Sequence, residues 1–565
     1  MFVRTKTTPN SPRKSVQVVE NERDSKTGKV KQRILRHVGI AFDEIEEEKL
    51  RQLALELIEK IELDRRKNPP QLQLFDSPIK EEFKDSIARN TRGRKPKKRI
   101  EEILPITEVS LDMVLEEARI IDGVHEVVGH LYDFLGFRKL LGTSRYNEIL
   151  RDLTLSRISQ PKSKHATCKI LRRYYDKEHD LDAIYRTMDQ VYKRISNIKQ
   201  AVFTSTSNLF SSNVDLLLFD VTTLHFESTD TDELREFGYS KNFRFNTTQV
   251  VLALATNADG LPIGYELFEG NKAEVSTLMD SIESWKKLFA IESVCFVGDR
   301  AMFSKHNISR LESLNYQYII AAKLKALPAE LKIQVLDEQH YKPTILNQEL
   351  AWIGEFEYQG QRLISSYKSR RAMKDQQDRL RVLDKVQKVI GKRSNPKKLI
   401  TNQGVKKFVS VNDDAMVTLD QNKIEDAAQW DGLHGIITNI RNDAPGSLIA
   451  RYAKLWIIEE SFRVNKHTLQ MRPIFHWAPP RIHAHIAICY MTFSVLRHLQ
   501  YRVNLTQKIS IDTILDELMN VQASIYLHKK TKDRYRVPGS YSNNARKIYR
   551  AFECERSLDA KIHMP

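Results

Sequence analysis

The sequence predicts an α/β fold whose core is a mixed sheet of three antiparallel strands followed by two parallel ones. Three observations indicate this fold. Residues 101–210 have helical periodicity, short and almost wholly apolar runs begin after residue 210, and amphipathic segments of helical length separate the last of these runs. Strand signals in one block, with helices interleaved only at its end, are typical of such a mixed sheet.

The first three strands are predicted to form an antiparallel meander. Val214–Phe219 is almost continuous in apolar residues, as expected of a strand buried on both faces, and Asp220 follows it directly. Thr248–Thr256 and Leu261–Phe268 are the next two strands, and the turn at Asn257–Gly260 joins them.

A helix over Glu274–Phe289 leads to the two remaining strands. Ser293–Val297 is the fourth strand, followed closely by Asp299, and Tyr318–Ala322 is the fifth. Between these two strands, Ser304 is placed to cap a short helix. Three antiparallel strands, then helix, strand, helix and strand, is the order of a ribonuclease-H-like sheet.

The composition bounds the kind of protein and its partners. The 565 residues are too many for one core and predict three or four domains. A net charge of +17 and a pI of about 9.4 favour a polyanionic partner. No apolar run suits a membrane span or a signal peptide, so we expect a cytoplasmic protein with no membrane partner. The four cysteines form no CxxC pair, which argues against a structural zinc site.

The N-terminal 100 residues form a basic region that is a candidate for DNA binding. Residues 1–40 carry ten Lys or Arg against three acids, in two β-like runs. Phe42–Arg66 has helical spacing, and 68–100 is a polar linker. Three basic side chains of the linker surround Gly93: Arg92, Arg94 and Lys95. An extended backbone would let them enter a narrow minor groove, whereas a disordered basic spacer would explain the same composition.

Residues 101–210 are predicted to be a helical domain. The expected helices are 114–124, Val127–Leu141, Arg145–Ile158, Lys169–Lys177 and Leu181–Ile198. Positive charge concentrates around a proline-containing turn, at Arg157, Lys162, Lys164, Lys169, Arg172 and Arg173. Helix bundles of this kind often contact DNA, and they as often only support a neighbouring domain.

The most informative stretch is Leu448–Trp477, which has the apolar spacing of a helix anchored in a core and is predicted to stop at Pro473. Tyr452, Glu459 and Lys466 are seven residues apart. Seven residues make almost two turns of about 3.6 residues each. The three side chains are therefore expected on one face of the helix.

Asp220, Asp299 and Glu459 are the candidate catalytic and metal-binding residues. An ionised carboxylate at the end of a buried strand is costly unless it is paired or bound to a cation. The first and fourth strands of the predicted sheet are neighbours, so both aspartates would reach one divalent ion, and a helix packed on the sheet would supply the glutamate. Mg²⁺ or Mn²⁺ suits this donor set and assists attack on a phosphodiester. Either aspartate alone could instead cap a turn or pair with Arg300.

With these residues in place, the chain resembles the DDE transposases of bacterial insertion sequences, in the class with a Tyr-Arg-Glu-Lys signature. The resemblance runs from about Asp215 to His485, and Tyr452, Glu459 and Lys466 match the spacing of the signature. Other segments that look like their counterparts are GYSKNFRFNTTQV (Gly238–Val250), FEGNKAE (Phe268–Glu274), FVGDRAMFS (Phe296–Ser304) and WDGLHGIITN (Trp430–Asn439). Several motifs in the right order make the resemblance specific.

The resemblance implies a ribonuclease-H-like core in which Asp220, Asp299 and Glu459 bind metal and Tyr452 and Lys466 hold DNA phosphates. Water would attack the phosphodiester at the element's end, and the freed 3′-hydroxyl would then attack target DNA. The implied partners are double-stranded DNA, as terminal inverted repeats and target, and a second copy in a homodimer on DNA. No small-molecule substrate is expected, and the protein would be nucleoid-associated.

Two other functions fit the same residues. One is a non-catalytic DNA-binding protein derived from a transposase, and loss of an acid would be its mark. The other is a nuclease of the same fold that cuts DNA without joining it, which only an assay for joined products separates.

The chain departs from the signature at its arginine position, which is Leu455. Leu455 falls on the apolar stripe and is expected to pack inward. Arg463 lies one turn beyond Glu459 on the other side and is proposed to take over the phosphate contact. Arg300, next to Asp299, is a further candidate DNA contact.

The chain between the second and third acids is longer than a strand and a helix need, which predicts an insertion over 326–430. The resemblance implies that this insertion is β-rich and contacts the DNA end, whereas a solvated surface would explain its basic loop equally well. Its expected parts are a hairpin of Trp352–Tyr358 and Gln361–Lys368, a charged helix over Arg371–Ile390, a basic loop over Gly391–Lys398, and strands near Phe408–Val411 and Met416–Leu419. The predicted layout is an N-terminal region over 1–100, a helical domain over 101–210, a core over 211–325 and 431–500, the insertion, and a C-terminal tail over 501–565.

Overall fold

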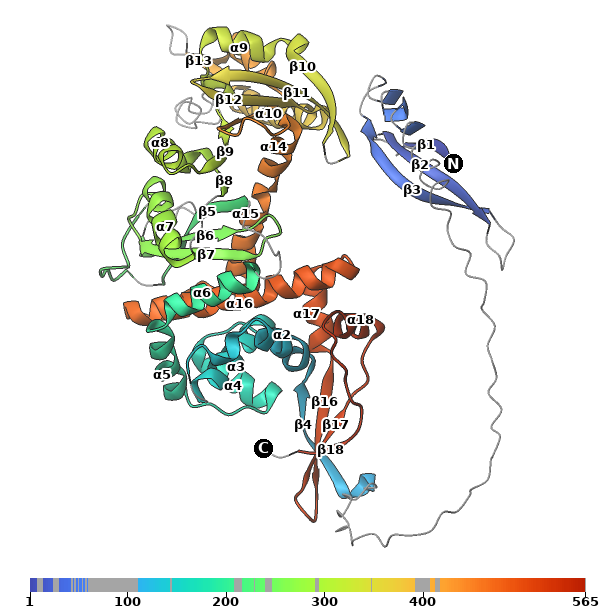
Figure 1. The fold of residues 1–565 in the computed structure, drawn as a ribbon, viewed down its shortest axis with the longest axis vertical. Helices are drawn as coiled ribbons and strands as arrows, with labels where there is room; N and C mark the ends of the chain where they lie inside the picture. Colours follow the sequence, from blue (N-terminus) through green and yellow to red (C-terminus); the bar gives the residue numbers. More distant parts are fainter. Residues whose placement is uncertain are drawn as a thin grey trace, which may run out of the picture. The chain divides into compact units, whose positions relative to one another are not determined.

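The computed structural model shows two compact units, and each is described by itself. Unit 1 comprises Met1–Leu115 with Gln348–Leu350, and unit 2 comprises Glu116–Asn347 and Ala351–Pro565. Figure 1 labels their helices and strands. The structure describes residues 1–7, 14–23, 30–41, 110–142, 145–207, 216–227, 229–238, 246–289, 294–346, 348–391, 407–411 and 417–563, with single positions between 44 and 58.

Unit 1 contains a three-stranded antiparallel sheet in the order β1-β2-β3. Its strands are β1 (Phe2–Thr7), β2 (Lys14–Arg23) and β3 (Val30–Ala41). Val16, Val18 and Val38 on one face of the sheet form a small core with Leu50 and Ala54, two helical positions. The two β-like runs expected in residues 1–40 thus belong to a sheet of three strands. The linker residues Arg92, Arg94 and Lys95 lie outside the described residues.

Unit 2 is built on a nine-stranded mixed sheet in the order β10-β11-β12-β15-β9-β8-β5-β6-β7. The strands expected from the sequence are β5 (Leu216–His225), β6 (Gln249–Thr256), β7 (Pro262–Glu269), β8 (Cys295–Gly298) and β9 (Gln317–Ala322). β5, β6 and β7 pair antiparallel, and β8 pairs parallel to both β5 and β9. The result is a mixed α/β fold.

Strand β5 illustrates why the centre of this sheet is almost wholly apolar. Alternate residues of a strand point to opposite faces. Leu217 and Phe219 belong to the core under α7 (Glu274–Phe289), whereas Leu216 and Leu218 belong to the core under α15 (Trp456–Arg463) and α16 (Pro479–Thr506). Both faces are therefore covered by helices, and Figure 1 shows α7 and α16 near the strands that they cover.

The predicted insertion contributes its first strands to the same sheet. β10 (Tyr341–Leu346), β11 (Glu349–Tyr358) and β12 (Gln361–Tyr367) are joined to β9 through β15 (Leu433–Thr438). The predicted hairpin is confirmed, and Gln359 (φ 52°) and Gly360 (φ 75°) form its turn in the left-handed region that favours glycine. The charged helix is confirmed as α10 (Ser369–Gly391), and the two short strands as β13 (Val409–Val411) and β14 (Val417–Leu419). Most of the basic loop lies outside the described residues.

The predicted helix over 114–124 is wrong, because this segment forms strand β4 (Val114–Ile121). β4 is an edge strand of a four-stranded sheet in the order β18-β17-β16-β4. Its neighbour β16 (Gln522–His528) lies some four hundred positions later in the chain. The spacing of Val114, Ala118 and Ile121 fits a helix locally, and a partner so distant gives no local signal. Ser524 Oγ donates a hydrogen bond of 2.8 Å to Glu116 Oε1 between these two strands.

The remaining helices of this region follow the sequence patterns in position, but the single helix expected over Leu181–Ile198 is two helices, and the one expected over Lys169–Lys177 begins earlier, at Lys164. They are α2 (Gly129–Phe134), α3 (Arg145–Ser159), α4 (Lys164–Tyr175), α5 (Leu181–Tyr192) and α6 (Ile195–Ser207). The helix expected over Val127–Leu141 is shorter than predicted. A π-helical turn precedes α2, and Gly136, at φ 82°, ends the helical run before Phe137.

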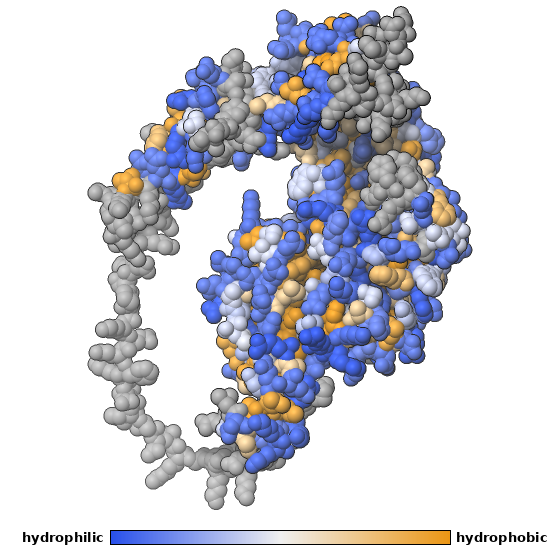
Figure 2. Space-filling view, turned by 180° about the vertical axis from the view of Figure 1, so that it is seen from behind, coloured by the Kyte–Doolittle hydropathy of each residue, from blue (hydrophilic) through white to orange (hydrophobic). Residues whose placement is uncertain are grey.

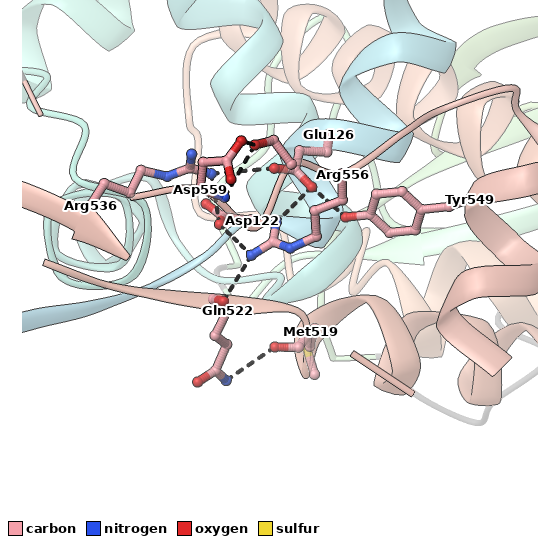
Figure 3. A network of polar contacts seen from close by, with 9 residues as sticks. Asp122, Glu126, Met519, Gln522, Arg536, Tyr549, Arg556 and Asp559 are labelled. Atoms are coloured by element: carbon pink, nitrogen blue, oxygen red, sulfur yellow. Dashed lines mark hydrogen bonds and ion pairs between the residues drawn. The ribbon is translucent and has the colours of Figure 1, made fainter. Parts of the chain in front are cut away.

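The C-terminal segment packs against the start of unit 2. It consists of α17 (Ile511–Met519), β16, β17 (Arg534–Pro538), α18 (Asn543–Ala551) and β18 (Lys561–Ile562). Figure 3 shows the polar network that joins the two segments. Arg556 donates to Asp122 Oδ2 at 2.9 Å and to Glu126 Oε2 at 2.7 Å, and Arg536 Nη2 lies 2.7 Å from Asp122 Oδ2.

Helix α16 (Pro479–Thr506) is long and apolar because it is the central helix of unit 2. Its residues from Ala484 to Leu499 are all buried. In the described part of the chain, no helix is long and apolar enough to cross a membrane. The face of the molecule in Figure 2 is mainly hydrophilic, with apolar residues scattered over it.

Candidate active site

Asp220 and Asp299 lie at matching positions on two neighbouring parallel strands. The sequence predicted that Asp220 follows the end of this strand. β5 instead continues to His225, so Asp220 lies within the strand. β8, however, ends at Gly298, whose partner in β5 is Phe219. Asp220 is therefore the first residue of β5 beyond the end of β8, and Asp299 is the first residue after β8.

The face of β5 that carries Asp220 is the face covered by α15. Asp220 alternates with Phe219 and so shares its face with Leu218 and Thr222. Lys466 Nζ donates a hydrogen bond to Thr222 Oγ1. The Asp220 carboxylate itself accepts a 2.7 Å bond from the backbone N–H of Val221. Lys466, the last residue of the candidate signature, therefore contacts β5 two residues after Asp220.

The prediction of one helix that runs from Leu448 and stops at Pro473 is wrong in detail. The segment consists of α14 (Pro445–Tyr452), a 3₁₀ turn (Ala453–Leu455), α15 (Trp456–Arg463) and a π turn (Val464–Thr468). The π turn arises where the Asn465 side chain donates to the carbonyl of Ser461 at 2.9 Å and the N–H of Leu469 reaches back five residues to Val464. The helical run ends at Thr468, before Pro473.

Tyr452 connects the second and third acids. Burial raises the pKa of Tyr452 to about 12, and the negative charges of Asp299 and Glu459 act in the same direction. Asp299, which follows β8, and Glu459 on α15 are both exposed. The ring of Tyr452 also lies against that of His434, with centroids 5.2 Å apart.

A basic cavity of about 460 Å³ lies next to Tyr452, because His434 lines it. Its basic lining residues are Lys323, Lys325, Arg371 and His434. Burial lowers the pKa of His434 to about 4, with help from Arg371 and Lys368. The neutral imidazole and the surrounding cations favour an anionic occupant. Sequence reasoning missed these residues, although His434 lies in the WDGLHGIITN motif.

The other predicted DNA contacts have different outcomes. Leu455 is half-buried and packs against the core of unit 2, which confirms that it points inward. Arg463 is 71% exposed and lies 3.8 Å from Glu460, so its guanidinium is at the surface. Arg300 is half-buried in a 3₁₀ turn that follows Asp299.

The three acids provide the right kind of ligand for a hard divalent cation, since carboxylate oxygens suit Mg²⁺ and Mn²⁺. The sequence predicted all three within reach of one ion. Among the described residues, no three His, Cys, Asp or Glu side chains are close enough together to hold a metal ion. The structure gives neighbouring positions to Asp220 and Asp299, and the negative charges of Asp299 and Glu459 both raise the pKa of Tyr452. The carboxylate oxygens of the three acids suit Mg²⁺ or Mn²⁺, although the three side chains do not form one cluster.

Comparisons with known proteins give two family matches. A model of the transposase DDE domain matches residues 214–493, and a model of the N-terminal domain of IS1634 family transposases matches residues 2–67. Together they match more than half of the chain. A comparison with curated proteins finds no match.

Among solved structures, two complexes of the Mos1 transposase are similar to this chain. One is a paired-end complex with the left transposon end, and the other is the Mos1 mariner paired-end complex with Mn. In each case the identity is 12%, the TM-score is 0.14, and the match covers 31% of this chain and 59% of the Mos1 chain.

The N-terminal match lies in unit 1, and the DDE match lies almost entirely in unit 2. The N-terminal model covers the sheet of unit 1, and the DDE model begins just before β5 and ends within α16. The DDE match therefore contains Asp220, Asp299 and Glu459 together with the strands and helix that carry them. The chain belongs to the DDE transposases of insertion sequences.

Proposed function

We propose that this chain moves a DNA element by cutting the DNA at the element's ends and joining the freed ends to target DNA. The observation that carries the proposal is the matched position of Asp220 and Asp299 at the end of the β5–β8 pairing. The strand order β7-β6-β5-β8-β9, antiparallel and then parallel, supports a ribonuclease-H-like core. Helix α15, which packs on β5, carries Glu459, the proposed third acid.

Asp220, Asp299 and Glu459 are the proposed ligands of Mg²⁺ or Mn²⁺. Such ions, when bound, neutralise charge on the phosphodiester and assist both the attacking and the leaving oxygen. The protein's own part is positioning, because phosphoryl transfer depends on alignment and charge neutralisation more than on covalent catalysis. Lys466, held on Thr222, and Tyr452, between two acids, are the proposed contacts to phosphates next to the cleaved bond.

The DNA strand is proposed to reach the acids along the basic cavity beside His434. Lys323, Lys325 and Arg371 line it, and no acidic side chain does so among the described residues. Arg463, exposed on α15, is proposed to replace the arginine that the signature places at Leu455. The proposed assembly is a homodimer that holds two terminal inverted repeats on the nucleoid, because two ends must be cut and joined together.

The test is an assay of cleavage and strand transfer with the element's own end DNA and Mg²⁺ or Mn²⁺. Asp220→Asn, Asp299→Asn and Glu459→Gln should each lower both reactions by at least a hundredfold and leave DNA binding within twofold. Glu269→Gln is the matched control, because Glu269 is an exposed acid at the end of β7, an edge strand of the same sheet. It should behave as the parent does.

The same assay separates the other two functions. A nuclease of this fold would give nicked but no joined products, and a DNA-binding derivative would give neither. Retention of strand transfer in Glu459→Gln would disprove the assignment of the third acid.

A further inference from the structure

A second basic cavity, of about 320 Å³, lies within unit 2 between the helical region and the segment that follows the π turn. One wall comes from the end of α3 and the start of α4, and the other from 470–476 and from α16. The lining side chains with basic groups are Arg157, Lys162, Lys164, Arg472, His476 and His485. Among the described residues, no aspartate or glutamate lines this cavity.

Lys164 is the central feature of this cavity. Its side chain is only 5% exposed, and in the described part of the chain its ammonium group has neither a hydrogen bond nor an ion pair. Burial and the charge of Arg157 lower its pKa to about 7. The charge of Lys164 also lowers the pKa of His476 and of His485, so these side chains lie around one point. A buried ammonium without a partner is costly unless something supplies negative charge.

Arg157 fixes the shape of the cavity. Its guanidinium donates to the carbonyl of Leu469 at 2.8 Å, to that of Gln470 at 3.2 Å and to that of Lys162 at 3.3 Å. All these acceptors are neutral, so the positive charge of Arg157 is held in place but not balanced. It therefore adds to the positive potential that Lys164 creates.

The start of α4 adds donors to the same cavity. Ser163 is the N-cap, and its Oγ accepts from the N–H of Ala166 at 3.3 Å. The first-turn N–H groups of Lys164 and His165 have no acceptor within the helix. Both these groups and the helix dipole favour an anion at this end of a helix of 12 residues.

We propose that this cavity binds a phosphate group, with the Lys164 ammonium and the first turn of α4 as its donors. The phosphate belongs either to free inorganic phosphate or to the backbone of a DNA strand, since both present the same oxygens. Lys162, Gln470 and Phe475, which are exposed, leave the mouth of the cavity open. Binding of free phosphate does not depend on the proposed transposition, whereas the DNA source rests on it.

The experiment titrates inorganic phosphate into the full chain in a phosphate-free buffer of low ionic strength, by calorimetry. Lys164→Met and Arg472→Gln should each remove one phosphate site or weaken it at least tenfold. Lys169→Met is the matched control, because Lys169 is exposed on the same helix and does not line the cavity. It should keep the site within twofold. A Lys164→Met variant that is folded and binds phosphate as tightly as the parent would overturn the proposal.

A second titration identifies the source of the phosphate. If the cavity takes a DNA phosphate, a short duplex should displace inorganic phosphate, and Lys164→Met should reduce the slope of log affinity against log salt by about one. If it takes free phosphate alone, the variant should lose phosphate binding and keep the DNA affinity of the parent. Variants of Asp220, Asp299 or Glu459 should bind phosphate normally, so a failure of the catalytic assignment is distinguishable from a failure here.

Discussion

Unit 2 contains two groups of buried charges that are built in opposite ways. In the first, Arg556 is fully buried and contacts both Asp122 and Glu126, while Arg536 contacts the same two acids (Figure 3). In the second, Lys164 is almost as deeply buried and has no carboxylate beside it.

The difference teaches what each group is for. A charge whose partner is part of the chain stabilises the fold, and here the paired group joins the start of unit 2 to its C-terminal end. A charge without an internal partner lowers the stability of the free protein, and its negative counterpart must come from outside. The paired group is therefore structural, whereas the unpaired group is what a binding site for an anion requires.

The largest expected effect is on the paired group. Arg556→Met should lower the free energy of unfolding by about 3–5 kcal/mol, because it removes one of the two cationic partners of the buried Asp122 carboxylate and leaves Glu126 with Arg536 and the Tyr549 hydroxyl. Urea unfolding followed by circular dichroism measures it. Lys547→Met, an exposed lysine on α18, is the control and should leave the midpoint unchanged. Equal midpoints for the two variants would show that the network does not hold the C-terminal segment.

Removal of the unpaired charge of Lys164 should stabilise the protein, whereas removal of Arg556 should destabilise it. Lys164→Met should raise the free energy of unfolding at pH 7 by roughly 2–4 kcal/mol, because each pKa unit corresponds to about 1.4 kcal/mol and local relaxation recovers part of the cost. The same urea experiment, without phosphate, measures the change. A loss of stability comparable to that of Arg556→Met would mean that Lys164 has an internal partner.

The stability difference between parent and Lys164→Met should depend on pH. The pKa of Lys164 is lowered from 10.5 to about 7 on folding. Between these values the unfolded chain binds a proton that the folded chain does not, so the parent gains stability as pH rises. The difference should be full below pH 7, smaller at pH 9 and absent near pH 10.5. A difference that is constant across this range would contradict the assigned pKa.

A smaller effect should appear at His476. Burial lowers its pKa to about 3, and the charge of Lys164 is the next cause. In Lys164→Met the pKa of His476 should rise, while Arg157 and Arg481 keep it below the ordinary value. Two-dimensional NMR of the imidazole resonances against pH measures the shift. His434, which lies in the other cavity, serves as the control and should titrate as in the parent.

The smallest effect is expected where paired charges are exposed. Arg172 and Glu178 form an ion pair in which both side chains are 72% exposed. Solvent and salt screen such a pair, so Arg172→Ala should cause no resolvable change in the melting temperature. A clear decrease would show that pairing stabilises this protein even at the surface, and the contrast between the two buried groups would lose its meaning.

Much of the fold could be predicted from the sequence because it depends on local patterns. The apolar strands β5 to β9, helix α7 and the cap of α8 (Lys305–Ser313) by Ser304 all follow from short-range periodicity and capping. Features that depend on distant partners could not be predicted. β4 has the spacing of a helix and becomes a strand only because β16 lies beside it.

The candidate site divides in the same way. Asp220 and Asp299 were proposed from their positions at apolar strands, and Glu459 from the signature spacing. The cavity beside His434 was not, because β9, α10 and β15 contribute its residues and no single stretch contains them. The positive cluster at Arg157 and Lys164 was visible as charge, but not as a cavity.

The sequence by itself therefore determined most kinds of elements and proposed the three acids, since apolar periodicity and residue chemistry are local properties. Only the tertiary structure decided which charges meet a partner. Asp122 and Glu126 are paired because the chain returns to them some four hundred residues later, and Lys164 remains unpaired because no acid lines its cavity in the described chain. Pairing depends on distances in space, which spacing along the chain does not fix.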